Sequence, residues 1–269
     1  MNLLKSLFPA FIKYPLWFIF KSPQRKLGWY TLWLDLGAYL KVYLINPLSK
    51  KRSLESISIC VGIYNRSEVF INHFIKSLAQ CKNQHLIELS VTDFGSTDMD
   101  NLRAEIEKTF KGKLVFNTHA GSFTRAIAFN QAVNQCSNEK IFICDADFSL
   151  PIDIVEQCNR YTQGKLVWFP IVFYLYKNKP EVFGKKNGEW MIWGGKGILA
   201  CNKSHFIQVG KLDERFTEWG YEDEELWQRF YVNRFFIIRT KCSSLLHHWH
   251  SSQNLKYKKL EELADSGML

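Results

Sequence analysis

Along most of the chain, hydrophobic residues recur in a pattern that is typical of strands alternating with helices. The apolar run 57–63 predicts a strand. Ile71, Phe74, Ile75 and Leu78 then fall on one helical stripe. The alternation continues with strands expected over 86–91, 114–116 and 141–145 and helices over 102–110 and 123–135. This order predicts an α/β fold, with right-handed βαβ units on a mixed, mostly parallel, Rossmann-like sheet flanked by helices.

The pattern is less regular in the second half of the chain. The apolar run 166–174 predicts one more strand. Because this strand contains Pro170, which has no N–H to donate, we expect it at a sheet edge or a bulge. A polar loop is expected over 177–189, long enough to be mobile. A helix is expected to begin near Glu222, and a further strand over 235–238 completes the predicted elements.

Residues 1–52 differ in charge from the rest of the chain. They carry nine basic side chains and one acidic side chain, Asp35, and so hold +8 of the total net charge of +9. Residues 53–269 are left with +1, so a basic globular surface for nucleic acid is not indicated. The chain therefore divides into a basic N-terminal segment, 1–52, and one large domain, 53–269.

The apolar runs of the N-terminal segment are interrupted by charge or proline. One contains Lys13 and Pro15 and the next contains Asp35 and Lys41, so neither is an uninterrupted membrane span of about 20 residues. A signal-peptide cleavage pattern is also missing. Tryptophan and tyrosine mixed with basic residues suit the headgroup layer of an anionic membrane. We expect a helical, amphipathic segment that associates with a membrane surface; alternatively, its aromatic side chains pack on the large domain as an extra layer.

The strand expected over 141–145 ends in one carboxylate and is followed two residues later by another. In extended chain, Asp145 and Asp147 point to the same side, and two negative charges in one small volume are costly unless a cation lies between them. A hard divalent ion held by carboxylates usually keeps positions open for substrate phosphates. The pair therefore indicates a metal site, although a strand that ends in a polar turn has the same pattern.

A third acid, Asp93, also follows a predicted strand. In parallel sheets, ligands bind at the carboxyl ends of the strands, where all three aspartates are expected to lie. The chain has neither Gly-x-Gly-x-x-Gly nor a Walker-type loop. An ordinary dinucleotide enzyme and a P-loop NTPase are thus disfavoured.

Several spaced motifs, taken in order, resemble one family. They are Asp93-x-Gly-Ser-Thr-Asp98, Phe123-x-Arg125-Ala126-x-x-x-Asn130, Asp145-x-Asp147, Trp193-Gly-Gly195, Trp219-Gly-x-Glu222-Asp223 and a late histidine-rich stretch, 247–250. Over about residues 55–252 the chain resembles the nucleotide-sugar glycosyltransferases of the GT-A fold, in particular the β-1,4-galactosyltransferase group and its bacterial chondroitin-polymerase-like relatives. The resemblance implies a GT-A domain that uses a UDP-sugar.

The resemblance also implies a metal site. Asp147 matches the acid that binds Mn²⁺ directly. Asp145 is expected either to bind the ion as well or to contact a group that binds it. His250 matches the metal-binding histidine, and His247 is placed as a second ligand, whereas His248 is expected to take no part. Mixed carboxylate and imidazole ligands suit Mn²⁺ better than Mg²⁺.

Donor binding is implied for five residues. Asp93 matches an acid that recognises uracil or ribose, with a turn-forming role as the alternative. Arg125 matches the arginine that holds the diphosphate, with a surface ion pair as the alternative. Asp145, Trp193 and Gly195 complete the expected donor site, where Gly195 lets the backbone approach closely.

Catalysis is implied for the acidic turn that opens the late helix. Asp223 matches the general base, and Glu222 is expected to orient the acceptor. Trp219 offers a flat face for an acceptor sugar ring. The four consecutive acids 222–225 have an alternative role as favourable charge at a helix N-terminus.

Taken together, the sequence predicts an inverting, metal-dependent glycosyltransferase that moves a hexose or N-acetylhexosamine from a UDP-sugar to a glycan or lipid-linked glycan of a capsule, lipopolysaccharide or other surface polysaccharide. The alternatives are a nucleotidyltransferase that makes a sugar nucleotide and a non-catalytic carbohydrate-binding protein. Seven scattered cysteines, without a Cys-x-x-Cys spacing, favour a reducing compartment. We therefore expect a cytoplasmic protein, peripheral on the inner face of a bacterial plasma membrane.

Overall fold

Two β-sheets form the framework of the protein. The computed structural model describes residues 25–45, 53–192, 194–217 and 220–250. The larger sheet has the strand order β10-β6-β9-β4-β1-β2-β3, and the smaller sheet has the order β5-β11-β7-β8. The strands are β1 (Ile57–Ile63), β2 (Ile87–Asp93), β3 (Lys113–Thr118), β4 (Lys140–Ile143), β5 (Phe148–Ser149), β6 (Leu166–Trp168), β7 (Ile171–Leu175), β8 (Gly188–Trp190), β9 (Leu199–Asn202), β10 (Phe236–Ile238) and β11 (Lys241–His247).

The predicted parallel core of four strands is confirmed. β1 pairs in parallel with β2 and with β4, and β2 pairs in parallel with β3. β9 runs antiparallel to β4 and to β6, so the sheet is mixed. The carboxyl ends of β1, β2 and β4 therefore open on one edge, as expected for a ligand site.

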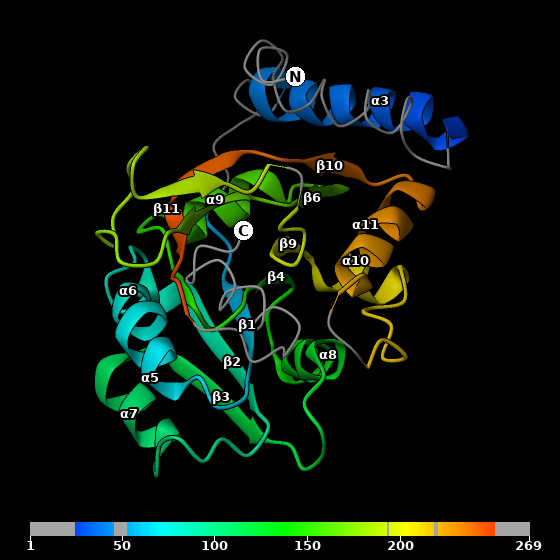
Figure 1. Cartoon of the computed structure of the whole chain (residues 1–269). Coiled ribbons are helices and arrows are strands. Elements are labelled where there is room, and N and C mark those ends of the chain that lie inside the picture. The colour runs from blue at the N-terminus through cyan, green and yellow to red at the C-terminus, as the bar shows by residue number, and fades with distance from the viewer. Residues whose placement is uncertain (1–24, 46–52, 193, 218–219, 251–269) are drawn as a thin grey trace, which may run out of the picture.

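Both faces of the larger sheet are covered by helices (Figure 1). Side chains alternate between the faces along each strand: Ile57, Ile59 and Val61 belong to one buried cluster, and Cys60 belongs to the other. The first cluster takes side chains from η2 (Phe70–Ile75), α6 (Lys76–Leu78), α7 (Leu102–Thr109) and α9 (Ile154–Tyr161). The short helical turn α5 (Ser67–Val69) leads into η2. The second takes them from α8 (Arg125–Gln135), α10 (Lys203–Gln208) and α11 (Glu222–Val232). A short 3₁₀ turn, η3 (Gln84–Leu86), precedes β2.

The prediction of a single strand over 166–174 is wrong. The run is divided at Pro170 into β6 of the larger sheet and β7 of the smaller one. Because proline donates no hydrogen bond, the ladder is interrupted there and the chain passes from one sheet to the other. The polar loop that follows is shorter than expected, since its last residues form β8 against β7.

The described part of the N-terminal segment packs on the large domain. Helix α3 (Arg25–Leu40), continued by η1 (Lys41–Ile45), lies across β10 (Figure 1). The Tyr39 hydroxyl donates to the Arg239 carbonyl at 2.6 Å, and the Tyr231 hydroxyl lies 2.6 Å from the buried Asp35 carboxylate. This is the packing that the sequence left open as the alternative to membrane association.

The same helix also has an exposed side. Trp33 is 70% exposed and Leu44 is 58% exposed, with Leu36 and Leu40 between them. The apolar runs before Arg25 lie outside the described residues. No helix in the described ranges is both long and apolar enough to cross a membrane.

Candidate active site

Asp147 lies in a turn where the two sheets meet. β4 ends at Ile143, and the chain turns through Asp147 into β5. β11 pairs antiparallel with β5, and the backbone N–H of His248 donates to the Asp147 carbonyl at 2.9 Å. This pairing brings two histidines to the carboxylate: His250 Nε2 is 2.7 Å and His247 Nε2 is 3.6 Å from Asp147 Oδ2.

These three side chains fit a divalent metal ion. Their ligand atoms lie within 4.8 Å of one another. Within the described ranges, the second carboxylate oxygen of Asp147, Oδ1, is buried and has no hydrogen-bond partner. Burial alone would raise the pKa of Asp147, but the charge and hydrogen bonds of His247 and His250 outweigh it and hold the pKa well below its usual range. An ionised carboxylate with two imidazoles is a donor set that suits Mn²⁺.

Asp145 does not join this group, contrary to the expectation that both aspartates face one metal. Its carboxylate accepts two hydrogen bonds from Arg125, from Nε at 2.8 Å and from Nη2 at 3.0 Å. The residues between β4 and β5 form a turn rather than extended chain, so the rule that i and i+2 share a side does not apply. The cation beside Asp145 is a guanidinium.

Arg125 connects three parts of the chain. Thr124 caps α8 by accepting from the Ile127 N–H, which places Arg125 at the first helical position. Besides Asp145, the guanidinium donates to Glu222 Oε1 at 3.1 Å and to the Gly197 carbonyl at 2.7 Å. Burial alone would lower the pKa of Arg125, but the carboxylates of Asp145, Glu222 and Asp223 outweigh burial and raise the pKa above its usual value.

These contacts match the ion-pair alternative for Arg125, although the pair is largely buried rather than on the surface. A side chain at position 197 would collide with the guanidinium, because a Cβ there would lie 2.3 Å from Arg125 Nη2. The glycine therefore allows the backbone to approach Arg125 closely.

Glu222 and Asp223 open α11, as predicted. Glu222 is buried and paired with Arg125, while its other oxygen, Oε2, has no hydrogen-bond partner among the described residues. Asp223 is half-buried, and its Oδ1 accepts from the Glu224 N–H at 2.8 Å. Their position at a helix N-terminus fits the helix-charge alternative as well, and the pairing with Arg125 links them to the site.

Tyr174 is a site residue that the sequence did not reveal. Its ring stacks on His247 with centroids 4.2 Å apart. Burial, followed by the negative charges of Asp145 and Asp147, raises the pKa of its phenol, and Asp223 adds to the effect. The geometric link between the β4–β5 turn and α11 is Arg125, which contacts both Asp145 and Glu222.

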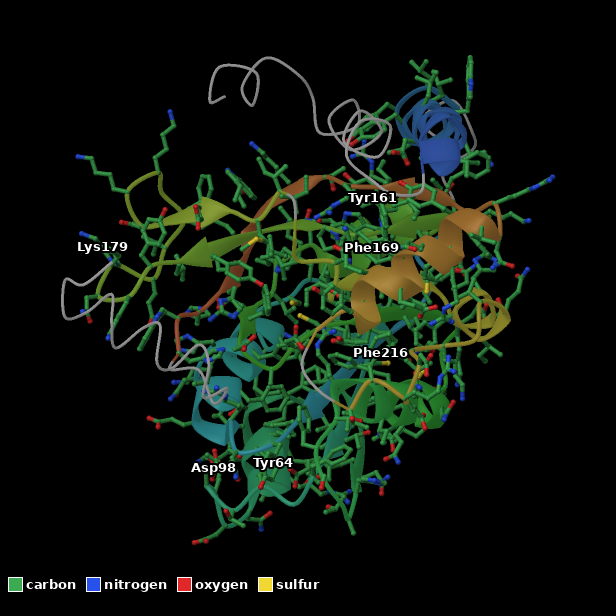
Figure 2. All side chains as sticks on the ribbon, turned by 45° about the vertical axis from the view of Figure 1, so that its right-hand side comes forward. Tyr64, Asp98, Tyr161, Phe169, Lys179 and Phe216 are labelled. Atoms are coloured by element: carbon green, nitrogen blue, oxygen red, sulfur yellow. The ribbon has the colours of Figure 1, made fainter. Side chains whose placement is uncertain are left out.

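Arg66 is a second residue that was missed. It follows β1, and the charges of Asp147 and Asp98 act on its guanidinium, although burial lowers its pKa overall. The turn that carries it is tied to the turn after β2, because Ser67 N donates to Asp98 Oδ2 at 2.9 Å. Figure 2 shows Tyr64 and Asp98 side by side in these two turns. A basic residue in the turn after the first strand was the available signal.

Asp93 has the turn-forming role that the sequence left open. It ends β2, and its Oδ1 accepts from the backbone N–H of Ser96 at 3.0 Å and from the Ser96 hydroxyl at 2.6 Å. Contact with a uracil or a ribose stays a prediction. Among the other expected residues, Gly195 has a φ of 64°, which favours glycine. Trp193 and Trp219 lie outside the described residues.

The fold is that of the GT-A glycosyltransferases. Two solved structures are similar to it: S. aureus TarS 1-349 in complex with UDP-GlcNAc and the mannosyltransferase PcManGT from Pyrobaculum calidifontis in complex with GDP-Man and Mn²⁺. The alignment with TarS has a TM-score of 0.58 at 17% identity and covers 75% of this chain and 60% of the TarS chain. The alignment with PcManGT has a TM-score of 0.54 at 12% identity and covers 90% of this chain and 76% of the PcManGT chain.

Sequence comparison places the chain more narrowly. The family model described as chondroitin N-acetylgalactosaminyltransferase matches residues 19–263, so the chain belongs to this family. Mouse (Mus musculus) chondroitin sulfate N-acetylgalactosaminyltransferase 1 is 27% identical over 218 residues, which are 72% of this chain and 41% of the mouse protein. Human (Homo sapiens) chondroitin sulfate synthase 3 is 28% identical over 217 residues, 73% of this chain and 24% of the human protein. The chain thus spans less than half the length of these relatives.

Proposed function

We propose that this protein is an inverting, metal-dependent glycosyltransferase that moves an N-acetylhexosamine from a UDP-sugar to a hydroxyl of a glycan. The observation that carries the proposal is the meeting of Asp147, His247 and His250, with Asp145 of the same turn joined through Arg125 to Glu222 of α11. The family supports N-acetylgalactosamine as the transferred sugar, and the names of the relatives support an acceptor of the chondroitin type.

Donor binding begins at the metal ligands. Asp147, His247 and His250 would hold Mn²⁺, which supplies positive charge for the diphosphate of the donor. We assign to Arg66, in the turn after β1 at the edge of the sheet where ligands bind, the contact with the diphosphate that was first expected of Arg125. Arg125 itself holds Asp145 and Glu222 in position around the donor.

Proton transfer is assigned to the N-terminus of α11. Asp223 accepts the proton of the acceptor hydroxyl as that oxygen attacks C1 of the donor sugar. Attack from the face opposite the departing UDP inverts the anomeric centre. Glu222 is fixed by Arg125 through one oxygen, and its second oxygen is left to accept a hydrogen bond from the acceptor. The two neighbouring acids therefore have different tasks.

We also propose that the protein works at the cytoplasmic face of a bacterial plasma membrane, on a glycan destined for the cell surface. Support comes from the apolar side chains that α3 and η1 expose, with Trp33 70% and Leu44 58% exposed, and from the basic character of residues 1–52. All seven cysteines are free and buried, which fits a reducing compartment.

A screen of UDP-sugars with Mn²⁺ tests the proposed reaction. Release of UDP and transfer to short chondroitin-type oligosaccharides are measured for the wild type, Asp147→Asn and Asp223→Asn. We expect UDP-N-acetylgalactosamine to be turned over by the wild type, and Asp223→Asn to bind the donor normally but to transfer at least about 100-fold more slowly. Normal transfer by Asp223→Asn would show that the base has been misassigned.

A further inference from the structure

A second group of metal-ligating side chains lies next to the first. It consists of His73, Glu181 and His248, whose ligand atoms are within 4.8 Å of one another. Glu181 Oε2 is 3.6 Å from His73 Nδ1 and 3.4 Å from His248 Nδ1. The two imidazole rings are stacked, with centroids 3.6 Å apart, so one ring must turn out of the stack before both can direct a nitrogen at the same ion. Neither the reaction proposed above nor the family resemblance assigns a task to these residues.

His248 reaches this group because it follows His247 directly. Successive side chains at the end of a strand point to opposite sides. His247 faces Asp147 and Tyr174, and His248 faces His73 on η2 instead. The chain thus supplies one imidazole to each of two neighbouring groups.

The Nδ1 atom of His248 is the observation that points to a ligand. The residue is only 3% exposed, and within the described ranges its Nδ1 is buried without a hydrogen-bond partner. Its other nitrogen, Nε2, is 2.6 Å from the Ser149 hydroxyl. When Nε2 donates to Ser149, Nδ1 carries a lone pair directed at the group, which is the arrangement that orients histidine ligands in metal sites.

The other two ligands come from structures of different rigidity. His73 lies on η2 between Phe70, Phe74 and Ile75, all of which are fully buried, so its backbone is firmly held. Glu181 lies on the loop 176–187 that joins β7 to β8, and its side chain is 58% exposed. Figure 2 shows this loop, marked by Lys179, standing out from the rest of the molecule. Within the described ranges its ion pairs are with His73 and His248, and an exposed carboxylate paired in this way contributes little to stability.

We propose that His73, Glu181 and His248 bind a second divalent transition-metal ion, of the Zn²⁺ type, which fastens the loop 176–187 to the body of the domain. Two imidazole nitrogens and one carboxylate oxygen form a known zinc donor set, with water in the fourth position. The loop leads through β8 to the segment that carries Gly195. Fastening it would restrict that side of the candidate active site.

The binding of Zn²⁺ to the full chain tests this site without donor or acceptor. Equilibrium dialysis is expected to find two Zn²⁺ ions per wild-type chain, since both groups have suitable ligands. Glu181→Ala is expected to weaken one of them at least tenfold. The matched control is Glu189→Ala, which removes an exposed acid from the same hairpin and is expected to keep both ions.

Trypsin locates the ion. Lys185 and Lys186 are exposed on the loop, so cleavage after them reports whether the loop is fastened. We expect Zn²⁺ to slow this cleavage at least fivefold in the wild type and in Glu189→Ala, but to leave it unchanged in Glu181→Ala and His73→Ala. The proposal is overturned if Glu181→Ala binds Zn²⁺ like Glu189→Ala, or if Zn²⁺ does not protect the loop of the wild type.

Discussion

Arg125 is the single residue on which the arrangement of the candidate site depends most. It pairs with Asp145 and Glu222, which come from different parts of the chain. A carboxylate left without its partner in a largely buried place is destabilising. Arg125 therefore links the stability of the domain to the placement of the acids.

Replacing Arg125 should separate its contribution from that of ordinary ion pairs. We expect Arg125→Ala to lower the free energy of unfolding by about 3 kcal/mol, because Glu222 then lacks its cation. The control is Arg103→Ala, which removes an exposed pair with Glu107 and should cost less than about 1 kcal/mol. Urea unfolding measures both. Equal losses for the two variants would contradict the role given to Arg125.

The fate of Asp145 and Asp147 shows what the sequence can predict about a site and what it cannot. The acids themselves were recognisable because they follow a strongly apolar strand. The resemblance also named His247 and His250 as ligands beside Asp147, and His250 does contact that carboxylate across 103 residues. The pairing of Asp145 with Arg125, across 20 residues, is a tertiary contact that no sequence pattern contained. Tyr174 was missed for the same reason, because an aromatic residue in a strand usually belongs to the core.

Among the elements, those with regular periodicity were predictable and those defined by pairing were not. The strands β1 to β4 recur at similar spacings along the chain, and each carries apolar side chains in a short run or at alternate positions. β11, which delivers His247, alternates weakly and is held by pairing with β5 and β7. The division of 166–174 into two strands depends on Pro170 and on which neighbours the strands find, neither of which a hydrophobic pattern contains.

Helix α3 makes a pH-dependent contribution to stability through Asp35. Burial raises the pKa of Asp35 well above its usual range, although the Tyr231 hydroxyl and Arg239 oppose the shift. The folded state then holds this proton more tightly than the unfolded state. The contribution of Asp35 to the free energy of unfolding is therefore fully present below the unfolded pKa of about 4, and it is lost as the pH rises toward the folded pKa.

Asp35→Asn should remove this loss, because asparagine stays neutral and still accepts from Tyr231. Unfolding free energies measured between pH 4 and pH 8 are expected to fall for the wild type relative to Asp35→Asn, by up to about 1.4 kcal/mol per pH unit within the titration range. Asp100→Asn, at an exposed position, serves as the control and should follow the wild type. A pH-independent difference between the wild type and Asp35→Asn would contradict this account.

At the scale of the whole molecule, α3 and η1 have two sides. One side packs on β10, and the other exposes Trp33 and Leu44. The proposed membrane contact uses the exposed side, so it is compatible with the packing of the helix on the domain.

Vesicle flotation tests the membrane proposal. With vesicles that contain anionic lipid, we expect the double variant Trp33→Glu, Leu44→Glu to bind at least tenfold more weakly than the wild type, because it places two carboxylates against negative headgroups. Ile207→Glu, on α10 and 50% exposed, should bind like the wild type. If all three proteins bind equally, the exposed side of α3 is not the contact.

The central claim is that Asp147, His247 and His250 hold one metal ion on which donor binding depends. Calorimetric titration of UDP into the protein, with and without Mn²⁺, tests it most directly. The account predicts that the wild type binds UDP at least tenfold more tightly with Mn²⁺ than without it, and that Asp147→Asn and His250→Ala lose this difference while remaining folded. UDP binding that is equally tight without the metal, or a full metal effect in Asp147→Asn, would contradict it.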